Sequence, residues 1–236
     1  MGRQIEKLSV FLPAYNEEAN LQRTVANIVE NLQKNVSEWE IIIVDDGSKD
    51  STGSIADKLA EENHKISVIH HFPNRGYGAA FKSGLYGCKY PWISLIDSDG
   101  QFDFKEINRF LVTQEKTQAD LVIGYYLGRK VSFIRKLNSK LWQFLVFLLF
   151  GLNVRDIDCG FKLISKKVVD TIPHLESARG AFISSEFLIK AKKSGFRIVE
   201  IGVCHYPRRF GEATGAKLNV IVQSFIDLLK LWQKIT

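Results

Sequence analysis

Apolar runs and amphipathic stretches alternate along most of the chain. The apolar runs are short and predict buried strands at residues 8–13, 39–44, 66–70, 92–96, 119–125 and 198–203. Between them, apolar residues recur every three or four positions, a spacing that predicts helices and is clearest at Leu21, Val25, Ile28, Val29 and Leu32. This alternation favours an α/β fold with a doubly wound, mainly parallel sheet flanked by helices.

Local signals predict several helix boundaries. We expect Asn16 to cap the first helix and Ser51-Thr52 to open the second. Further helices are expected to end at Tyr86, to cover residues 104–114, and to run from Ser184 to a C-terminal cap at Gly195. An apolar stripe over residues 218–232 predicts a terminal helix. Near Leu163 the pattern is compatible with either a strand or a helix.

Polar loops follow the predicted strands, and two of them carry paired aspartates. Because the carboxyl ends of parallel strands share one edge of a sheet, the loop residues should converge on one cleft. We expect this cleft to contain Tyr15, Glu17, Asp45, Asp46, Arg75, Asp97 and Asp99.

The pair Asp97-Ser98-Asp99 ends a strand and precedes Gly100. Two carboxylates so placed can hold a divalent cation through hard oxygen ligands, and the cation can hold a diphosphate. A solvated turn is the alternative on these residues alone. The glycines after Arg75 lack the Gly-Lys-Ser/Thr of a phosphate-binding loop, and no Gly-x-Gly-x-x-Gly follows the first strand. P-loop, kinase and dinucleotide-binding functions are therefore disfavoured.

Composition narrows the setting in which the protein works. The 236 residues are 45% apolar and 25% charged, which suits a single globular domain. Three widely spaced cysteines, Cys88, Cys159 and Cys204, form no disulfide framework or zinc motif and favour a reducing compartment. The polar residues 1–7 lead directly into a strand, so no signal peptide is expected.

Positive charge is concentrated in one segment. Residues 128–155 contain six lysines or arginines and no acid, together with the longest apolar run, Phe144–Phe150. This combination is typical of a helix at an anionic membrane surface, although a buried helix with solvated basic flanks fits equally well. No zinc-finger or RNA-binding signature accompanies the charge, so we expect no nucleic-acid partner.

Six motifs occur in order along nearly the whole chain. They are Leu12-Pro13-Ala14-Tyr15-Asn16-Glu17, Val44-Asp45-Asp46-Gly47-Ser48, Asn74-Arg75-Gly76-Tyr77-Gly78, Asp97-Ser98-Asp99-Gly100-Gln101-Phe102, Asp158-Cys159-Gly160-Phe161-Lys162 and Tyr206-Pro207-Arg208-Arg209 with Gly211-Glu212. In this combination the chain resembles the inverting family two glycosyltransferases, which have the GT-A fold. It is most similar to the branch that transfers one sugar to a polyprenyl phosphate, as dolichyl-phosphate mannose synthases do.

The resemblance implies roles for individual residues. Nucleotide-sugar binding would fall to Pro13, Tyr15, Glu17, Val44, Asp46, Arg75, Ser98 and Arg208. Asp97, Asp99 and Gln101 would coordinate Mg²⁺ or Mn²⁺ on the donor diphosphate, and the catalytic set would be Asp97, Asp99 and Arg135. The acceptor phosphate would meet Arg129, Arg135 and Lys217, and residues 131–149 would form a basic amphipathic helix on the acceptor side.

The implied domain is single, 1–236, with a nucleotide-sugar half (1–103), an acceptor half (104–205) and a basic loop with a C-terminal helix (206–236). The implied reaction transfers a hexose, mannose or glucose, from GDP-mannose or UDP-glucose to dolichyl or undecaprenyl phosphate. It would take place at the cytoplasmic face of the membrane, with the enzyme bound peripherally and a membrane-anchoring subunit as a candidate partner. Relatives often carry Gly-x-Arg where this chain has Gly124-Tyr125-Tyr126, so Arg129 or Lys130 would replace that arginine.

Two other functions fit parts of the pattern. A glycosyltransferase of the same fold that acts on the hydroxyl of a soluble glycan would need a catalytic carboxylate, and the candidate position reads Ser184-Ser185-Glu186. A non-enzymatic membrane-binding module would leave the acidic strand ends unexplained. A phosphate acceptor needs no such base, because its second pKa is about 6 and it is already ionised near neutral pH.

Overall fold

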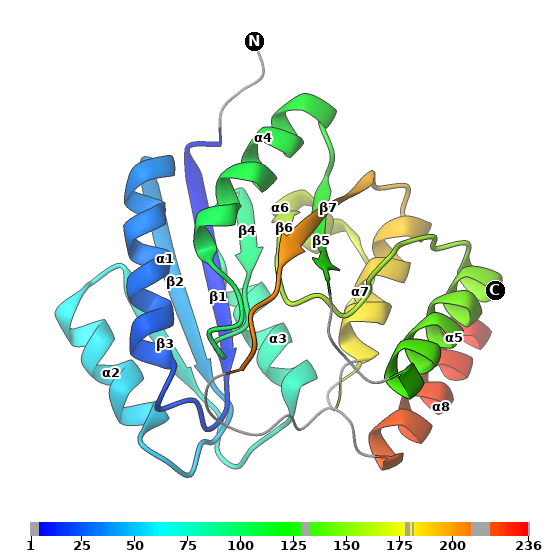
Figure 1. Ribbon diagram of the computed structural model, residues 1–236, viewed down its shortest axis with the longest axis horizontal. Coiled ribbons are helices and arrows are strands. Elements are labelled where there is room, and N and C mark those ends of the chain that lie inside the picture. Colours follow the sequence, from blue (N-terminus) through cyan, green and yellow to red (C-terminus); the bar gives the residue numbers. More distant parts are fainter. Residues whose placement is uncertain (1–4, 129–132, 178–179, 181, 209–217, 236) are drawn as a thin grey trace.

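The computed structural model describes residues 5–128, 133–177, 180, 182–208 and 218–235. Within these residues a seven-stranded sheet has the order β3-β2-β1-β4-β6-β5-β7 (Figure 1). The strands are β1 (Lys7–Ala14), β2 (Glu38–Asp45), β3 (Ile66–His70), β4 (Trp92–Leu95), β5 (Leu121–Leu127), β6 (Lys162–Ser165) and β7 (Ile198–Cys204).

The sheet is mainly parallel, as predicted. β1, β2, β3 and β4 pair in parallel, and so do β5 and β7. β6 lies antiparallel between β4 and β5, which settles the open choice near Leu163 in favour of a strand. Because β6 runs in the opposite direction, its first residue lies at the edge where β4 ends, with Lys162 opposite Leu95.

Helices cover both faces of the sheet. Helices α1 (Leu21–Asn35), α2 (Thr52–Glu62) and α4 (Ile107–Thr117), with the 3₁₀ turn η1 (Phe104–Glu106), pack on one face. Helices α3 (Tyr77–Gly87), α6 (Lys166–Thr171) and α7 (Phe182–Lys193) pack on the other. Helices α5 (Phe133–Phe150) and α8 (Leu218–Ile235) contact each other and α7 at one end of the molecule (Figure 1).

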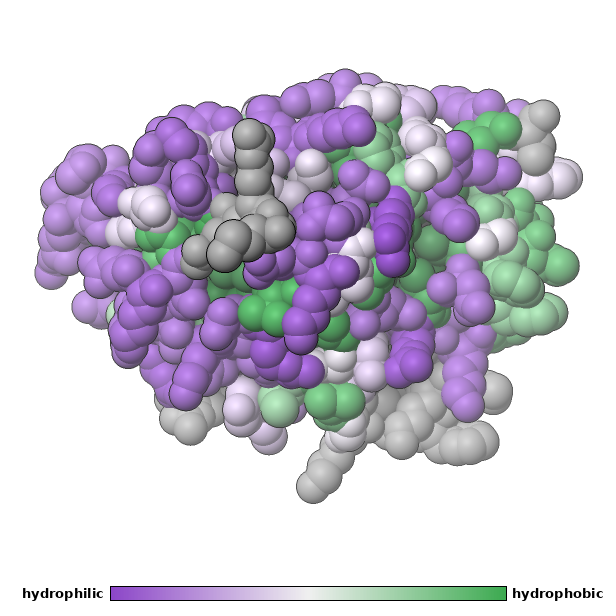
Figure 2. All heavy atoms as spheres, turned by 90° about the horizontal axis from the view of Figure 1, so that it is seen from above, coloured by the Kyte–Doolittle hydropathy of each residue, from purple (hydrophilic) through white to green (hydrophobic). Residues whose placement is uncertain are grey.

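The α5–α8 end presents apolar side chains to solvent. Trp142 of α5 packs edge-on against Phe225 of α8, with ring centroids 5.3 Å apart, which joins the two helices. Figure 2 shows hydrophobic residues gathered at this end, on a molecule that is otherwise largely polar in this view. We call this set the α5–α8 apolar face; its members are 39–64% exposed and are Leu141, Phe144, Phe147, Leu148, Ile226, Leu229 and Trp232. None of the described helices is long and apolar enough to cross a membrane.

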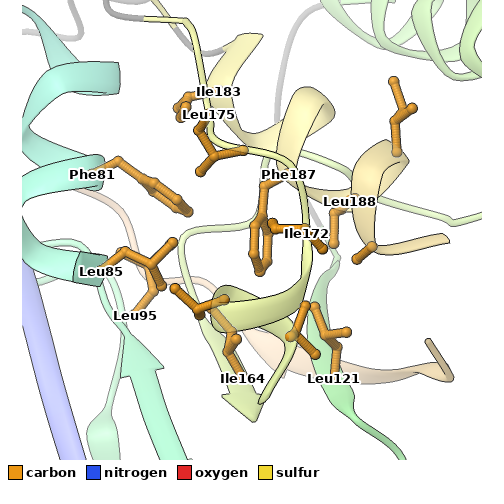
Figure 3. Close-up of a cluster of buried hydrophobic side chains, with 14 of the residues drawn as sticks. Phe81, Leu85, Leu95, Leu121, Ile164, Ile172, Leu175, Ile183, Phe187 and Leu188 are labelled. Atoms are coloured by element: carbon orange, nitrogen blue, oxygen red, sulfur yellow. The ribbon is translucent and has the colours of Figure 1, made fainter. Parts of the chain in front are cut away.

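The core consists of two apolar clusters, one on each face of the sheet. Strand periodicity sorts the residues: Leu8, Val10 and Leu12 of β1 point to the α1 side, and Phe11 points to the α3 side. On the α3 side, Phe81 and Phe187 lie 5.9 Å apart between α3 and α7 (Figure 3). The helices packed on both faces hold the sheet in place, and with it the edge from which the polar loops after β1, β2 and β4 extend.

Some helix boundaries differ from the predicted ones. Asn16 does not cap α1, because its backbone is left-handed (φ 55°) and the helix begins only at Leu21, after Asn20. Helix α7 begins at Phe182, so Ser184 and Ser185 lie inside it. The short helix α6 was not predicted, since its six residues are too few to show a periodic pattern.

Candidate active site

A pocket of about 330 Å³ opens at the edge of the sheet where β1, β2 and β4 end. Parallel strands bring their following loops to this one edge. The start of α3 and the loop after β7 complete the walls, which are lined by Pro13, Ala14, Tyr15, Glu17, Asp46, Asn74, Gly76, Tyr77, Ala80, Asp97, Ser98, Asp99 and Arg208. The structure thus brings together most of the strand-end residues that the sequence singled out.

Asp46 organises the loop that carries Asn74 and Gly76. Its buried carboxylate accepts hydrogen bonds from the main-chain N–H groups of Arg75 (2.9 Å) and Gly76 (2.8 Å), and its main-chain carbonyl accepts one from Asn74 Nδ2 (2.7 Å). The imidazole of His71 contacts the same carboxylate through Nδ1 (2.7 Å). Asp46 therefore fixes one wall of the pocket through its contacts with the backbone.

For the nucleotide-sugar ligand that the sequence resemblance implies, we expect Asp46→Asn to weaken binding by about 10-fold to 100-fold, since hydrogen bonds to a charged group contribute about 1.5–3 kcal/mol each. The amide would keep the size of the side chain but could not accept from both main-chain donors as an anion does. Isothermal titration with the nucleotide sugar measures the change. Asp45→Asn is the matched control, because Asp45 lies outside the pocket; equal effects of the two substitutions would contradict this role of Asp46.

Asp97 and Asp99 lie side by side in the pocket. The Tyr77 hydroxyl donates to Asp97 Oδ1 (3.2 Å), and Asp99 Oδ1 accepts from the Gln101 N–H (3.1 Å). Desolvation, and then the negative charge of Asp99, raise the pKa of Asp97 to about 7. Burial and the neighbouring Asp97 raise the pKa of Tyr77 well above its usual value, so this phenol remains a hydrogen-bond donor at neutral pH.

Arg208 forms ion pairs with two of the pocket acids. Its guanidinium bridges Glu17 Oε1 (3.1 Å) and Asp99 Oδ2 (2.8 Å). Tyr206, two residues before Arg208, forms two hydrogen bonds of 2.9 Å with Gln101. The Tyr206 N–H donates to the Gln101 carbonyl, and Gln101 Nε2 donates to the Tyr206 carbonyl. The loop after β7, which contains Arg208, is therefore held in place by its hydrogen bonds to Gln101, two residues after Asp99.

The donor set suits a divalent cation bound jointly with a ligand. Among the described residues there is no group of three His, Cys, Asp or Glu side chains that could hold a metal by themselves. Asp97 and Asp99 offer hard carboxylate oxygens, and their mutual repulsion is only partly offset by Lys162, Tyr77 and Arg208. Mg²⁺ is commonly held by one or two carboxylates plus phosphates and water, so the residues fit such a cation.

Several predicted site residues lie elsewhere. Asp45 does not line the pocket, because neighbouring strand residues point to opposite faces; it contacts His70 Nδ1 (3.0 Å) and accepts from the Ser48 N–H (3.0 Å). Val44 is fully buried in the core, and the exposed Arg75 contributes its N–H to Asp46 without its side chain lining the pocket. The side chain of Gln101 donates to the Tyr206 carbonyl.

The predicted acceptor residues are not placed by the structure. Arg129 and Lys217 lie outside the described residues. Arg135 lies on α5, but its side chain is likewise outside the description. Ser98 lines the pocket, and its hydroxyl donates to the Pro13 carbonyl (2.7 Å), which joins the β1 and β4 loops.

Tyr77 lines the pocket but was not among the predicted site residues. Tyr77 is the first residue of α3 and directly follows the loop held by Asp46, so its position in the Asn-Arg-Gly-Tyr-Gly motif was an available signal. Its contact with Asp97 joins segments that are far apart in the chain, which a single sequence does not reveal.

Solved structures with the same fold are glycosyltransferases. Glucosyl-3-phosphoglycerate synthase from Mycobacterium tuberculosis, solved with Mn²⁺ and UDP-glucose, superimposes with a TM-score of 0.74 at 19% identity, over 97% of this chain and 79% of that one. The same enzyme with phosphoglyceric acid gives a TM-score of 0.72 at 21% identity, over 97% and 80%. The predicted GT-A type of α/β fold is confirmed.

Sequence comparison identifies nearer relatives. The chain is 31% identical to a dolichyl-phosphate beta-glucosyltransferase of Dictyostelium discoideum, over 90% of this chain and 68% of the relative. It is 29% identical to an undecaprenyl-phosphate 4-deoxy-4-formamido-L-arabinose transferase of Proteus mirabilis, over 92% and 65%. Residues 9–172 match the model of glycosyl transferase family 2. The chain therefore belongs to glycosyl transferase family 2.

Proposed function

We propose that the protein transfers a hexose from a nucleotide sugar to a polyprenyl phosphate at a membrane surface, with a divalent cation on Asp97 and Asp99. The observation that carries the proposal is the pocket in which these two carboxylates face Arg208 beside the Asp46-held loop. The names of the nearer relatives, a dolichyl-phosphate and an undecaprenyl-phosphate transferase, support a lipid phosphate as acceptor. UDP-glucose and GDP-mannose are the donors to test first, and Mg²⁺ and Mn²⁺ the cations.

The proposed transfer brings a negatively charged donor diphosphate next to a negatively charged acceptor phosphate. The chain's own residues bind the nucleotide against β1 and the Asn74–Gly76 loop, and Arg208 can direct two N–H groups at diphosphate oxygens. A divalent cation bound by the carboxylates would neutralise the leaving nucleoside diphosphate. The acceptor phosphate attacks as an anion that is already ionised near neutral pH, since its second pKa is about 6.

The environment of Glu186 supports a phosphate acceptor, because Glu186 stands at the candidate position for the catalytic base of an enzyme that acts on a hydroxyl. Glu186 is buried, and its carboxylate accepts from the Glu176 N–H (2.8 Å), the Ser177 N–H (2.9 Å) and Lys190 Nζ (2.7 Å). Burial alone would raise the pKa of Glu186, but the hydrogen bonds from Lys190 and Ser177 outweigh it and lower the pKa. A side chain in this state is a structural anion and a poor general base, which disfavours transfer to a soluble glycan hydroxyl.

The acceptor side differs from the arginine-containing pattern of relatives. Tyr126 stands at the position of that arginine, and its ring packs against Phe102 and His205, with centroids 6.0 and 4.5 Å away. The cation for the acceptor phosphate must therefore come from another element. We propose Arg129, Arg135 and Lys217 for this role, because Arg129 follows β5, Arg135 lies on α5 and Lys217 directly precedes α8 in the sequence.

The α5–α8 apolar face is the proposed contact with the lipid surface. Four of its exposed residues, Leu141, Phe144, Phe147 and Leu148, belong to α5, whose sequence contains three lysines or arginines and no acid. All three cysteines are free, which supports the cytoplasmic, reducing side of the membrane as the location. The same face could also bind a membrane-anchoring partner subunit, which we propose as a candidate partner.

We expect the double substitution Phe144→Asp, Leu148→Asp to lower binding to anionic phospholipid vesicles by about 10-fold or more, because each buried large apolar side chain contributes about 1.5–3 kcal/mol. Vesicle co-sedimentation measures the change. Val112→Asp is the control, since Val112 is 41% exposed on α4, at another part of the surface. Vesicle binding that is unaffected by the double substitution would contradict the assignment of this face.

The proposed function is tested by incubating the purified chain with a panel of nucleotide sugars, Mn²⁺ or Mg²⁺, and one polyprenyl phosphate in detergent. Sugar should pass into an organic-extractable lipid from one donor of the panel. A chain that binds nucleotide sugar but modifies no polyprenyl phosphate would overturn the proposed acceptor.

A further inference from the structure

The carboxylate of Asp97 lies directly against the main chain of Gly160. A Cβ atom on residue 160 would overlap the Oδ2 and Cγ atoms of Asp97 and would lie 2.7 Å from Oδ1. Gly160 is not among the glycines with positive φ, so its backbone does not need glycine for conformational reasons. The missing side chain instead provides the space that the carboxylate fills.

The backbone around Gly160 is held in place from two sides. Lys162, which is fully buried, donates its ammonium group to the Cys159 carbonyl. On the β5 side, the Gly124 N–H donates to the Phe161 carbonyl (2.9 Å), and a Cβ on Gly124 would lie only 2.8 Å from Cys159 Sγ. The turn that precedes β6 is therefore a fixed surface for Asp97.

A second contact with the Asp97 carboxylate comes from α3. The Tyr77 hydroxyl donates to Asp97 Oδ1 at 3.2 Å, and the Tyr77 ring packs near Phe81 in the core, with centroids 6.4 Å apart. Asp97 thus lies between a hydroxyl donor anchored in the core and a backbone surface without a side chain. Both contacts limit rotation of the carboxylate group.

We propose that Gly160 and Tyr77 are positioning residues that hold the Asp97 carboxylate in the direction required to bind the divalent cation. The inference rests on the proposed function, because it concerns the same cation site. Groups that orient a metal ligand without touching the metal typically change metal affinity or activity about 10-fold to 100-fold when they are altered. Gly160 acts through space, and Tyr77 acts through its hydrogen bond.

The first test is Gly160→Ala in the full chain. We expect Mn²⁺ affinity, measured with and without a nucleoside diphosphate from the electron paramagnetic resonance signal of free Mn²⁺, to fall about 10-fold to 100-fold. Turnover should also fall and should recover in part at high Mn²⁺ concentration, which a general structural defect would not produce. Gly87→Ala is the control, because Gly87 ends α3 far from the site and a Cβ there would only approach the Ile42 and Ile69 side-chain ends at 3.3 and 3.4 Å.

The second test is Tyr77→Phe, which keeps the packed ring and removes only the hydroxyl. Loss of a hydrogen bond to a charged group should weaken Mn²⁺ binding by about 10-fold. Tyr86→Phe is the control on the same helix, since the Tyr86 hydroxyl accepts from the Leu175 N–H instead. If Gly160→Ala does not fold, the Mn²⁺ affinity of Tyr77→Phe alone tests whether the Asp97 carboxylate is held in place for the cation.

Folded variants that bind Mn²⁺ as tightly as the wild type would overturn the positioning role and leave the proposed function intact. If instead the wild-type chain transfers sugar to polyprenyl phosphate but binds no Mn²⁺ or Mg²⁺ even in the presence of a nucleoside diphosphate, the cation site fails and the positioning role fails with it. If the wild type binds Mn²⁺ and transfers no sugar to polyprenyl phosphate, the proposed acceptor fails, while weaker Mn²⁺ binding in the variants would still support the positioning role.

Discussion

Asp99→Asn is expected to lower turnover by about 10³-fold, the upper range for removing one electrostatic contact to a developing charge. The substitution keeps the shape of the side chain and removes the charge that, with Asp97, would hold the cation on the donor diphosphate. It also removes one of the two anionic partners of Arg208, whose guanidinium lies 2.8 Å from Asp99 Oδ2. Steady-state kinetics at saturating Mg²⁺ or Mn²⁺ measures the loss, and Asp97→Asn should behave alike.

Asp103→Asn is the matched control for Asp99→Asn. Asp103 lies four positions later, outside the pocket, and its carboxylate accepts from Asn27 Nδ2 (3.1 Å) and the Lys105 N–H (3.0 Å). We expect it to affect stability through these contacts while turnover of the folded enzyme stays near that of the wild type. Near-wild-type turnover in Asp99→Asn at saturating metal would refute the cation site.

Arg208→Gln is expected to shift metal binding and nucleotide binding in opposite directions. Because Arg208 neutralises Glu17 and Asp99 in the structure, its removal should strengthen binding of Mn²⁺ alone, by up to about 5-fold for ion pairs in which the arginine side chain is 24% exposed. The same change removes charged donors from the diphosphate and should weaken nucleotide-sugar binding by up to about 100-fold. Titrations with Mn²⁺ alone and then with the nucleotide sugar separate the two effects.

Arg155→Gln provides the comparison for Arg208→Gln. Arg155 is an exposed arginine that stacks on Tyr125, 4.6 Å from the ring centroid, and does not line the pocket. It should leave both titrations unchanged. A parallel loss of Mn²⁺ and nucleotide binding in Arg208→Gln would contradict the proposed competition between the arginine and the cation.

The fold was predictable because its strands are buried and therefore apolar. The predicted strand at residues 66–70 coincides with β3, and the terminal apolar stripe coincides with α8 within the described residues. Local capping signals were less informative. Asn16 has the side chain of a cap, but it adopts a left-handed turn and its carbonyl oxygen Oδ1 accepts from the Lys49 N–H (2.8 Å).

The site was predictable to the extent that it depends on strand ends. Asp46, Asp97 and Asp99 meet in one pocket because β2 and β4 lie on either side of β1 and all three parallel strands end at the same edge of the sheet. The sequence did not distinguish Asp45 from Asp46, since only the direction of each side chain at the end of β2 assigns one of them to the pocket. Nor did it reveal the contact of Gly160 with Asp97, which depends on the antiparallel insertion of β6 beside β4.

We propose that this pocket serves an acceptor that brings its own negative charge and needs no base from the protein. The most direct measurement compares a polyprenyl phosphate with the polyprenol of the same chain length as acceptors, with the same nucleotide sugar and metal. We predict glycosylation of the phosphate and none of the alcohol, because Glu186 is buried and already bonded to Lys190 and two main-chain N–H groups. Equal glycosylation of the polyprenol would contradict the account.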